Sequence, residues 1–235
     1  MLTGGERFMK AGRIRPLVLA LLFDLDGTLL DTFDQLLRAQ NEALAMFGEP
    51  PLAAEELRPL VGIPLAKQME ITRGMAGPRV AAINEEYYRR FRALVEEGVR
   101  VFPGVKETLV VMKSRPIGTM TTRRRDTADL MLRKAGIRSY FRSVVGGDEV
   151  ERPKPEPDLP RFAAQALGLR PSDCAVVGDA AVDVLAGNAA GARTIAAAYG
   201  YGRRSDLLAA KPHAVIESFA DLPMALAALE ARANP

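Results

Sequence analysis

The sequence predicts an α/β protein in which a Rossmann-like parallel sheet carries helices on both faces and a four-helix module is inserted after the first strand. Three observations predict this fold class. The apolar run Leu17–Phe23 is typical of a buried strand. From Ile117 onward, short β-rich runs alternate with helical stretches, which indicates a parallel sheet covered by helices. The segment between these parts, which ends near Pro103, shows helical spacing and no convincing strand.

The inserted module is predicted from amphipathic spacing that glycines and prolines interrupt. Four helices are expected there, at Leu36–Phe47, Ala53–Leu60, Leu65–Arg73 and Val80–Val95. A single crossover between strands would not need four helices. We therefore expect residues 34–99 to form a separate module, residues 17–33 and 100–235 to form the α/β core, and residues 1–16 to be a loose extension, with Met9 a possible alternative start.

The second half of the chain supplies most of the predicted sheet. Strands are expected at Ile117–Met120, Ser143–Val145, Ala175–Val177, Thr194–Ala197 and Ala214–Ile216. Helices with Ala/Leu-rich faces are expected between and after them, at Asp126–Ala135, Leu159–Leu167, Val182–Ala190 and Asp221–Ala231.

Composition narrows the functional classes. The 235 residues are 48% hydrophobic and 26% charged, which fits a globular protein and argues against disorder. The net charge of +3, without Trp or a basic stripe, argues against nucleic-acid binding. No apolar run is long enough for a membrane span, and the basic start flows into Asp24 without a cleavage site, so we expect a cytoplasmic protein. A single cysteine, Cys174, excludes an internal disulfide.

Two carboxylates stand at the end of the first strand, in Asp24-Leu25-Asp26-Gly27-Thr28. Side chains alternate along a strand, so Asp24 and Asp26 point the same way, and Thr28 offers a hydroxyl to the same pocket. Such a pair repels and loses hydration, so it normally needs a cation nearby. An Asp-rich turn is the structural alternative for an isolated motif of this kind.

Polar side chains also follow the other predicted strands. Because ligands bind at the carboxyl ends of strands in open parallel sheets, these side chains are expected to converge. They are Thr121 and Thr122 after Ile117–Met120, Lys154 after Ser143–Val145, and Asp179 and Asp183 after Ala175–Val177. This convergence, more than any one motif, predicts a catalytic site.

The pattern resembles the haloacid dehalogenase superfamily, specifically its phosphatases with a helical cap. The four signature motifs occur in order, as Asp24-x-Asp26-Gly27-Thr28, Thr121, Lys154 before a proline, and Gly178-Asp179-x-x-x-Asp183. Phosphoglycolate-phosphatase-like members are also similar in Phe102-Pro103-Gly104-Val105, Gly146-Gly147-Asp148 and Tyr199-Gly200-Tyr201-Gly202. The resemblance spans residues 17–229, and it implies that segment 34–99 is the cap.

The resemblance implies a role for each motif residue. Asp24 would attack phosphorus and form an aspartyl-phosphate, and Asp26 would protonate the leaving oxygen and then deprotonate water. Mg²⁺ would be held by the Asp24 side chain, the Asp26 main-chain carbonyl and Asp179. Thr121 and Lys154 would hold the phosphoryl oxygens. Asp183, one helical turn after Asp179, would reach back toward Lys154 or the waters on the metal.

Other residues have weaker assignments. Thr122 stands where relatives often carry Asn, and Ala180 stands where they commonly carry Ser or Thr, which puts metal affinity or rate in doubt. Arg123 could touch phosphate, although a solvated helix start is the favoured interpretation for Arg123–Arg125. Arg58 and Lys67 could meet a substrate anion, although a solvated helix face is favoured there. The five tyrosines are interpreted as filler, and the single histidine, His213, as structural.

The leading functional hypothesis is a Mg²⁺-dependent phosphohydrolase of a small phosphorylated metabolite, with phosphoglycolate as the first substrate guess. A pyrophosphatase or a sugar phosphomutase is the alternative, but Gly62-Ile63-Pro64-Leu65 lacks the Arg that family mutases tend to carry. The presence of Asp26 disfavours a dehalogenase. A catalytically silent binding or scaffold protein is the non-enzymatic alternative. We expect no nucleic-acid or membrane partner, and a monomer or homodimer.

Overall fold

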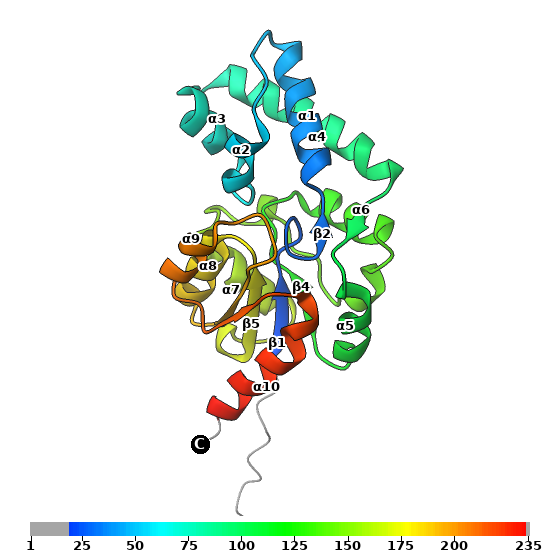
Figure 1. The fold of residues 1–235 in the computed structure, drawn as a ribbon, viewed down its shortest axis with the longest axis vertical. Helices are drawn as coiled ribbons and strands as arrows, with labels where there is room; N and C mark the ends of the chain where they lie inside the picture. The colour runs from blue at the N-terminus through cyan, green and yellow to red at the C-terminus, as the bar shows by residue number, and fades with distance from the viewer. Residues whose placement is uncertain (1–18, 234–235) are drawn as a thin grey trace, which may run out of the picture.

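The protein is described by a computed structural model that covers residues 19–233. The expected extension at residues 1–16 and the alternative start at Met9 lie outside the described residues. Figure 1 shows two layers, a sheet with surrounding helices and a group of helices, α1–α4, above the end of β1. None of the helices in the described part is long and apolar enough to cross a membrane.

The main sheet contains five parallel strands within the described residues, in the order β4-β1-β5-β6-β7. β1 lies between β4 and β5, and its residue Phe23 pairs with Thr119 of β4 on one side and Val177 of β5 on the other. This register aligns the carboxyl ends of the three strands at one edge of the sheet. The strands are β1 (Ala20–Phe23), β4 (Ile117–Thr119), β5 (Cys174–Gly178), β6 (Arg193–Ala197) and β7 (Ala214–Ile216).

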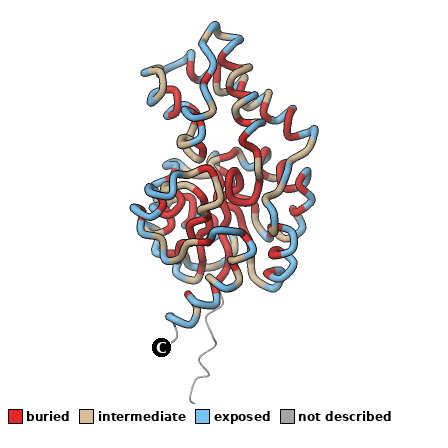
Figure 2. Tube along the Cα trace, in the orientation of Figure 1, coloured by how far each residue is buried: buried red, intermediate tan, exposed pale blue. Residues whose placement is uncertain are grey.

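Helices cover both faces of this sheet, as predicted, because its strands are apolar on both sides. Leu21 and Phe23 pack into the core shared with α5 (Val105–Met112), α6 (Arg125–Lys134) and α10 (Leu222–Ala233). Ala20 and Leu22 face the opposite side, where α7 (Asp158–Ala166) lies. On that side β6 is covered by α8 (Ala181–Ala190) and α9 (Arg204–Ala209). Figure 2 shows the buried residues concentrated along the sheet.

The helices of the upper layer enter between β1 and α5. They are α1 (Phe33–Met46), α2 (Ala54–Leu57), α3 (Leu65–Arg73) and α4 (Pro78–Glu97). The chain leaves the core through β2 (Leu30–Asp31) and returns through β3 (Arg100–Val101), and these two strands pair antiparallel. The two connections therefore lie side by side. α1 and α4 pack through buried apolar side chains that include Ala43 and Phe91.

Two predicted elements are wrong in detail. The expected helix Ala53–Leu60 is a four-residue α2 followed by a 3₁₀ turn at Arg58–Leu60, because Pro59 lacks an N–H and blocks continuation of the helix. The expected strand Ser143–Val145 makes only an isolated bridge between Ser143 and Gly118. Its ladder stops there because the Val145 N–H donates to the Thr119 hydroxyl instead of a backbone carbonyl.

Several elements have no counterpart in the predictions. They are α5, α9, the β2–β3 pair and the 3₁₀ turns at Arg138–Tyr140, Gly147–Glu149, Pro171–Asp173 and Phe219–Asp221. The other predicted helices and strands are observed, with ends that differ by up to three residues.

Candidate active site

The predicted strand-end residues come together at the carboxyl edge of the sheet. Asp24 follows β1, Thr121 lies just past β4, Asp179 follows β5, Asp183 lies in the first turn of α8, and Lys154 lies in the loop before α7. All five are buried. All five residues lie at the carboxyl ends of the parallel strands or in the segments that follow them. The fold therefore brings together side chains that lie up to 159 residues apart in the chain.

Lys154 forms the cationic centre of this group. Its Nζ lies 2.5 Å from Asp183 Oδ1 and 3.2 Å from Asp24 Oδ1. Burial alone would lower the pKa of Lys154, but the two carboxylates outweigh that effect and leave the pKa raised. Asp183 is held at both oxygens, because its Oδ2 also accepts a hydrogen bond from the Ala180 N–H. Asp183 therefore orients Lys154 and caps α8, at the position where Ala180 offers no hydroxyl.

Asp179 is held in a close-fitting cradle. Its Oδ1 accepts from the Thr28 hydroxyl at 2.8 Å, and its Oδ2 accepts from the Tyr201 N–H at 2.8 Å. Gly27 has a φ of +82°, and a Cβ there would lie 2.1 Å from Asp179 Oδ2. A Cβ at Gly200 would lie 2.2 Å from the Asp179 Cβ. The Gly-Thr of the first motif and the Tyr-Gly-Tyr segment thus shape the space for this carboxylate.

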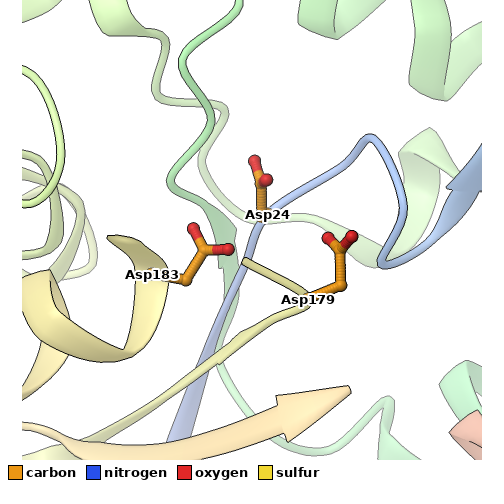
Figure 3. A group of neighbouring side chains, drawn as sticks. All are labelled: Asp24, Asp179 and Asp183. Carbon is orange, nitrogen blue, oxygen red and sulfur yellow. The ribbon is translucent and has the colours of Figure 1, made fainter. Parts of the chain in front are cut away.

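The carboxylates of Asp24, Asp179 and Asp183 fit a divalent cation. One oxygen from each lies within 4.8 Å of the others, and Figure 3 shows the three side chains facing a common space. Burial raises the pKa of Asp24 to about 6, although Lys154 opposes this rise. Burial, together with the charges of Asp183 and Asp24, raises the pKa of Asp179 to about 8. Three carboxylates face one ammonium here, so the cluster lacks positive charge.

The carboxylates of Asp24 and Asp179 have the donor chemistry that suits a divalent cation such as Mg²⁺. Asp24 Oδ1 accepts no hydrogen bond from the described residues, so it is free to bind a cation. All the available ligands are oxygens, which Mg²⁺ prefers. Asp183 Oδ1 lies 2.5 Å from Lys154 Nζ, so this carboxylate already has a cation as its partner, which suits a supporting position better than direct ligation; the hydrogen-bond donors to Asp179 are both neutral. The Asp26 main-chain carbonyl remains a predicted ligand.

A cavity lies between the sheet edge and helices α1–α4; Asp24 and Asp26 line it, whereas Thr121, Lys154 and Asp179 do not. Asp24, Asp26, Thr122 and Arg123 line it from the core. The opposite wall is formed by side chains of the upper layer, among them Leu36, Gln40, Val61, Gln68 and Tyr87. Gln40 and Gln68 are buried and hydrogen-bonded to each other. Ile63 and Pro64 also border a wider, mainly apolar cleft beside Lys154, which opens this region to one side.

Arg123 does not lie at a solvated helix start, so the favoured interpretation of that residue was wrong. It is buried, and its Nε lies 2.6 Å from Asp26 Oδ2. Asp26 Oδ1 accepts from the Thr32 hydroxyl. Both oxygens of Asp26 are therefore held by side chains, and one of them carries a full ion pair.

The remaining candidate residues lie in different surroundings. The Thr121 hydroxyl is buried and accepts from the Arg123 N–H. Thr28 bonds Asp179, so its hydroxyl orients a carboxylate. Arg58 does not line the cavity with Asp24; its guanidinium lies 4.0 Å from the centre of the Phe33 ring. Lys67 is exposed and paired with Glu70, as expected for a solvated helix face.

Two tyrosines, which their scattered positions in the sequence predict to be filler, support the site. Tyr199 donates its hydroxyl to the Thr28 carbonyl. The Tyr201 hydroxyl accepts from the N–H groups of Thr32 and Phe33, where the chain enters α1. The signal in the sequence was the pair of glycines flanking Tyr201, which indicates close backbone packing against another element.

Tyr201→Phe is expected to lower the free energy of unfolding by about 1–3 kcal/mol, because two buried N–H groups lose their acceptor. Urea unfolding of the purified protein would measure this change. Tyr199→Phe is the matched control, since it leaves a single carbonyl without a donor and should cost less. Equal stability of Tyr201→Phe and the wild type would contradict the role of this hydroxyl at the start of α1.

The parallel sheet, the aspartate that follows β1 and the buried Lys–Asp pair together are typical of an α/β hydrolase that acts on phosphoryl groups. A family model for haloacid dehalogenase-like hydrolases matches residues 21–197, and the chain belongs to this family. The chain is therefore a phosphatase of the family, as the resemblance implied.

Individual relatives agree with this class. The chain is 34% identical to phosphoglycolate phosphatase 1 of Pseudomonas aeruginosa over 211 residues, which cover 86% of this chain and 77% of that one. It is 33% identical to the pyrophosphatase PpaX of Bacillus velezensis over 207 residues, covering 87% and 94% of the two chains. The crystal structure of CbbY from Rhodobacter sphaeroides in complex with phosphate is similar, with a TM-score of 0.76, 29% identity, and 88% and 98% of the chains covered.

Proposed function

We propose that the protein is a Mg²⁺-dependent phosphohydrolase that removes the phosphoryl group of a small metabolite through an aspartyl-phosphate on Asp24. One observation carries this proposal. Asp24 is a buried carboxylate at the cavity wall; its Oδ1 lies 3.2 Å from Lys154 Nζ and accepts no well-aligned hydrogen bond from the described residues. Asp24 Oδ1 is an anionic oxygen that lies beside the Lys154 ammonium and near the Asp179 carboxylate, which could bind a metal ion. Such an oxygen is suited to attack the phosphorus of a phosphate, because nearby positive charge would offset the repulsion between the two anions.

The other residues divide the remaining work. Asp26 lies on the same cavity wall, where its carboxylate would first take a proton from solvent or from the phosphate monoanion, then donate it to the leaving oxygen, and later take one from the attacking water. The Thr121 hydroxyl and Lys154 Nζ would hold phosphoryl oxygens, with Asp183 keeping Lys154 in place. Mg²⁺ bound by Asp24, Asp179 and the Asp26 carbonyl would supply positive charge that offsets the repulsion between the phosphate and Asp24.

The segment 34–99 is proposed to act as a cap that excludes water from the reaction. Side chains of α1–α4 close the cavity on one side. The two chain segments that link these helices to the core pair with each other as β2 and β3. Exclusion of water would favour transfer to Asp24 and restrict the size of the leaving group.

Phosphoglycolate is the first substrate that we propose, since relatives at 34% identity carry that name. Pyrophosphate is the second, through the likeness to a pyrophosphatase. A phosphomutase role is the less favoured alternative, because Gly62-Ile63-Pro64-Leu65 offers no cation at the position where family mutases tend to carry Arg. A silent binding protein is disfavoured because Asp24, Asp26, Lys154 and Asp179 are all present and buried.

A panel of phosphates would test the proposal. The wild type should release phosphate only with Mg²⁺, and kcat/KM for phosphoglycolate should exceed that for pyrophosphate, sugar phosphates and an aryl phosphate by about tenfold or more. Chelation with EDTA should abolish turnover of every substrate. A preference for pyrophosphate would overturn the substrate assignment alone, and phosphate release from none of them would overturn the enzymatic proposal.

A further inference from the structure

Arg123 is a buried cation that the proposed chemistry does not use directly. Its side chain is 9% exposed and that of its partner Asp26 is 6% exposed, so the pair is shielded from water. The Nε–Oδ2 distance is 2.6 Å, and Thr32 donates to the other oxygen of Asp26. A guanidinium and a hydroxyl thus fix the orientation of the carboxyl group that is proposed to transfer the proton.

The far side of the Arg123 guanidinium is held by α4. Its Nη1 donates to the Tyr87 hydroxyl at 2.5 Å, and its Cζ lies 4.2 Å from the centre of the Phe91 ring. Tyr87 is buried, which raises the pKa of its hydroxyl to about 12 and keeps it a neutral partner. A continuous set of contacts therefore runs from Asp26 in the core to α4 in the upper layer.

The same boundary carries two further ion pairs. Arg124 Nη2 lies 2.5 Å from Glu85, and Arg92 of α4 lies 2.9 Å from Asp126 of α6. Both pairs are substantially exposed, and exposed ion pairs contribute little. Arg123 differs because it is buried, and because its loss would leave Asp26 without compensation for its charge.

We propose that Arg123 is a positioning residue that holds the Asp26 carboxyl in its reactive orientation and couples that orientation to the seating of α4 through Tyr87 and Phe91. This inference rests on the proposed function. The guanidinium of Arg123 contacts the Asp26 carboxylate on one side and the Tyr87 hydroxyl and the face of the Phe91 ring on the other. It therefore acts on the reaction through Asp26, and a direct contact with the substrate is the rival role that the test must separate.

Leaving groups of different basicity separate these roles. Phenolate leaves poorly and needs a proton from Asp26, whereas 4-nitrophenolate leaves readily without one. For Arg123→Met, kcat/KM should fall about a hundredfold with phenyl phosphate and less than about fivefold with 4-nitrophenyl phosphate. The inhibition constant of inorganic phosphate should stay within about twofold of the wild type, because phosphate binding would be intact.

Tyr87→Phe keeps the test valid if Arg123→Met folds poorly. It removes one hydroxyl from a buried side chain and should shift the same ratio of kcat/KM values in the same direction, by about fivefold. Arg123→Lys keeps the positive charge but lacks the planar guanidinium. Its kcat/KM with phenyl phosphate should therefore lie between the values of Arg123→Met and the wild type. Arg124→Met is the matched control at the neighbouring exposed pair and should leave both esters unaffected.

Each other outcome has a definite meaning. Equal loss with both esters in Tyr87→Phe and Arg123→Lys would overturn the positioning role. A weaker inhibition by phosphate, with an unchanged ratio between the esters, would assign Arg123 to substrate binding. In an Asp26→Asn background, Arg123→Met should change the ratio no further, and an additional change would also overturn the proposal. Inactivity of the wild type with every phosphate would instead overturn the proposed function.

Discussion

Asp24→Asn is expected to lower kcat for phosphate release by about a thousandfold or more while the protein remains folded. The amide has nearly the shape of the carboxyl but lacks the anionic oxygen that would attack phosphorus. It also places a neutral group 3.2 Å from Lys154 and removes one ligand of the proposed Mg²⁺ site. Phosphate release with Mg²⁺, measured on the best substrate of the panel, gives the result directly.

The stability of this variant separates chemistry from folding. Asp24, Asp179 and Asp183 carry like charges within 4.8 Å, so removing one charge relieves repulsion in the metal-free protein. The free energy of unfolding in EDTA should therefore equal or exceed that of the wild type. Asp34→Asn, on the exposed face of α1, is the matched control and should leave turnover unchanged. Turnover by Asp24→Asn comparable to the wild type would contradict the role of Asp24 as nucleophile.

The sequence predicted the sheet better than the connections. Strands such as Ala175–Val177 and Ala214–Ile216 are apolar runs between turn signals, so their pattern is local and readable. β2 and β3 are two residues each, and they exist because Leu30 meets Val101 across a long separation in the chain. Strands of two residues are too short to show an alternation of apolar and polar residues, so the sequence does not reveal this pairing. Ser143–Val145 shows the reverse error, since a side-chain hydroxyl replaced the expected backbone acceptor.

The candidate site residues that could be predicted from the sequence are those that come directly after a predicted strand. Asp24, Thr121 and Asp179 occupy strand ends, and the parallel topology alone brings them together. Tyr87, Thr32 and Tyr201 were missed because their contacts depend on how α1 and α4 are seated. Arg123 was misjudged for the same reason. A run of three arginines is typical of a solvated surface, and only the tertiary structure places the first of them beside Asp26.

The balance of charge among the buried side chains favours a cation at the proposed metal site. Asp26 is matched by Arg123 in one buried pair, and Asp183 is matched by Lys154 in another. Asp24 and Asp179 are the remaining carboxylates; Asp24 shares Lys154 with Asp183 at the longer distance of 3.2 Å, and Asp179 has no ion-pair partner among the described residues. Their pKa values are raised to about 6 and about 8, mainly by burial, so both carboxyl groups bind protons more readily than exposed aspartates do when no cation is bound.

Stability of the metal-free protein is therefore expected to fall as pH rises from about 4 to about 8, through the contribution of Asp179. Its pKa is about 8 in the folded protein and 3.8 in the unfolded chain, so the folded state binds more protons within this window. The free energy of unfolding then decreases with pH, by up to about 1.4 kcal/mol per pH unit for one proton. Mg²⁺ displaces that proton, so its stabilising effect should grow with pH.

Asp179→Asn isolates this contribution from the other titrating groups. Urea unfolding of both proteins between about pH 5 and pH 8, in EDTA and in excess Mg²⁺, would give the four pH profiles that are needed. The wild type in EDTA should lose stability with pH relative to the variant, and only the wild type should regain it with Mg²⁺. Asn can still accept from Thr28 at one atom, so the fold is retained while the titrating group is removed. Parallel EDTA profiles for the two proteins, or a Mg²⁺ effect that does not change with pH, would show that Asp179 is neither protonated in the metal-free site nor bound to the cation.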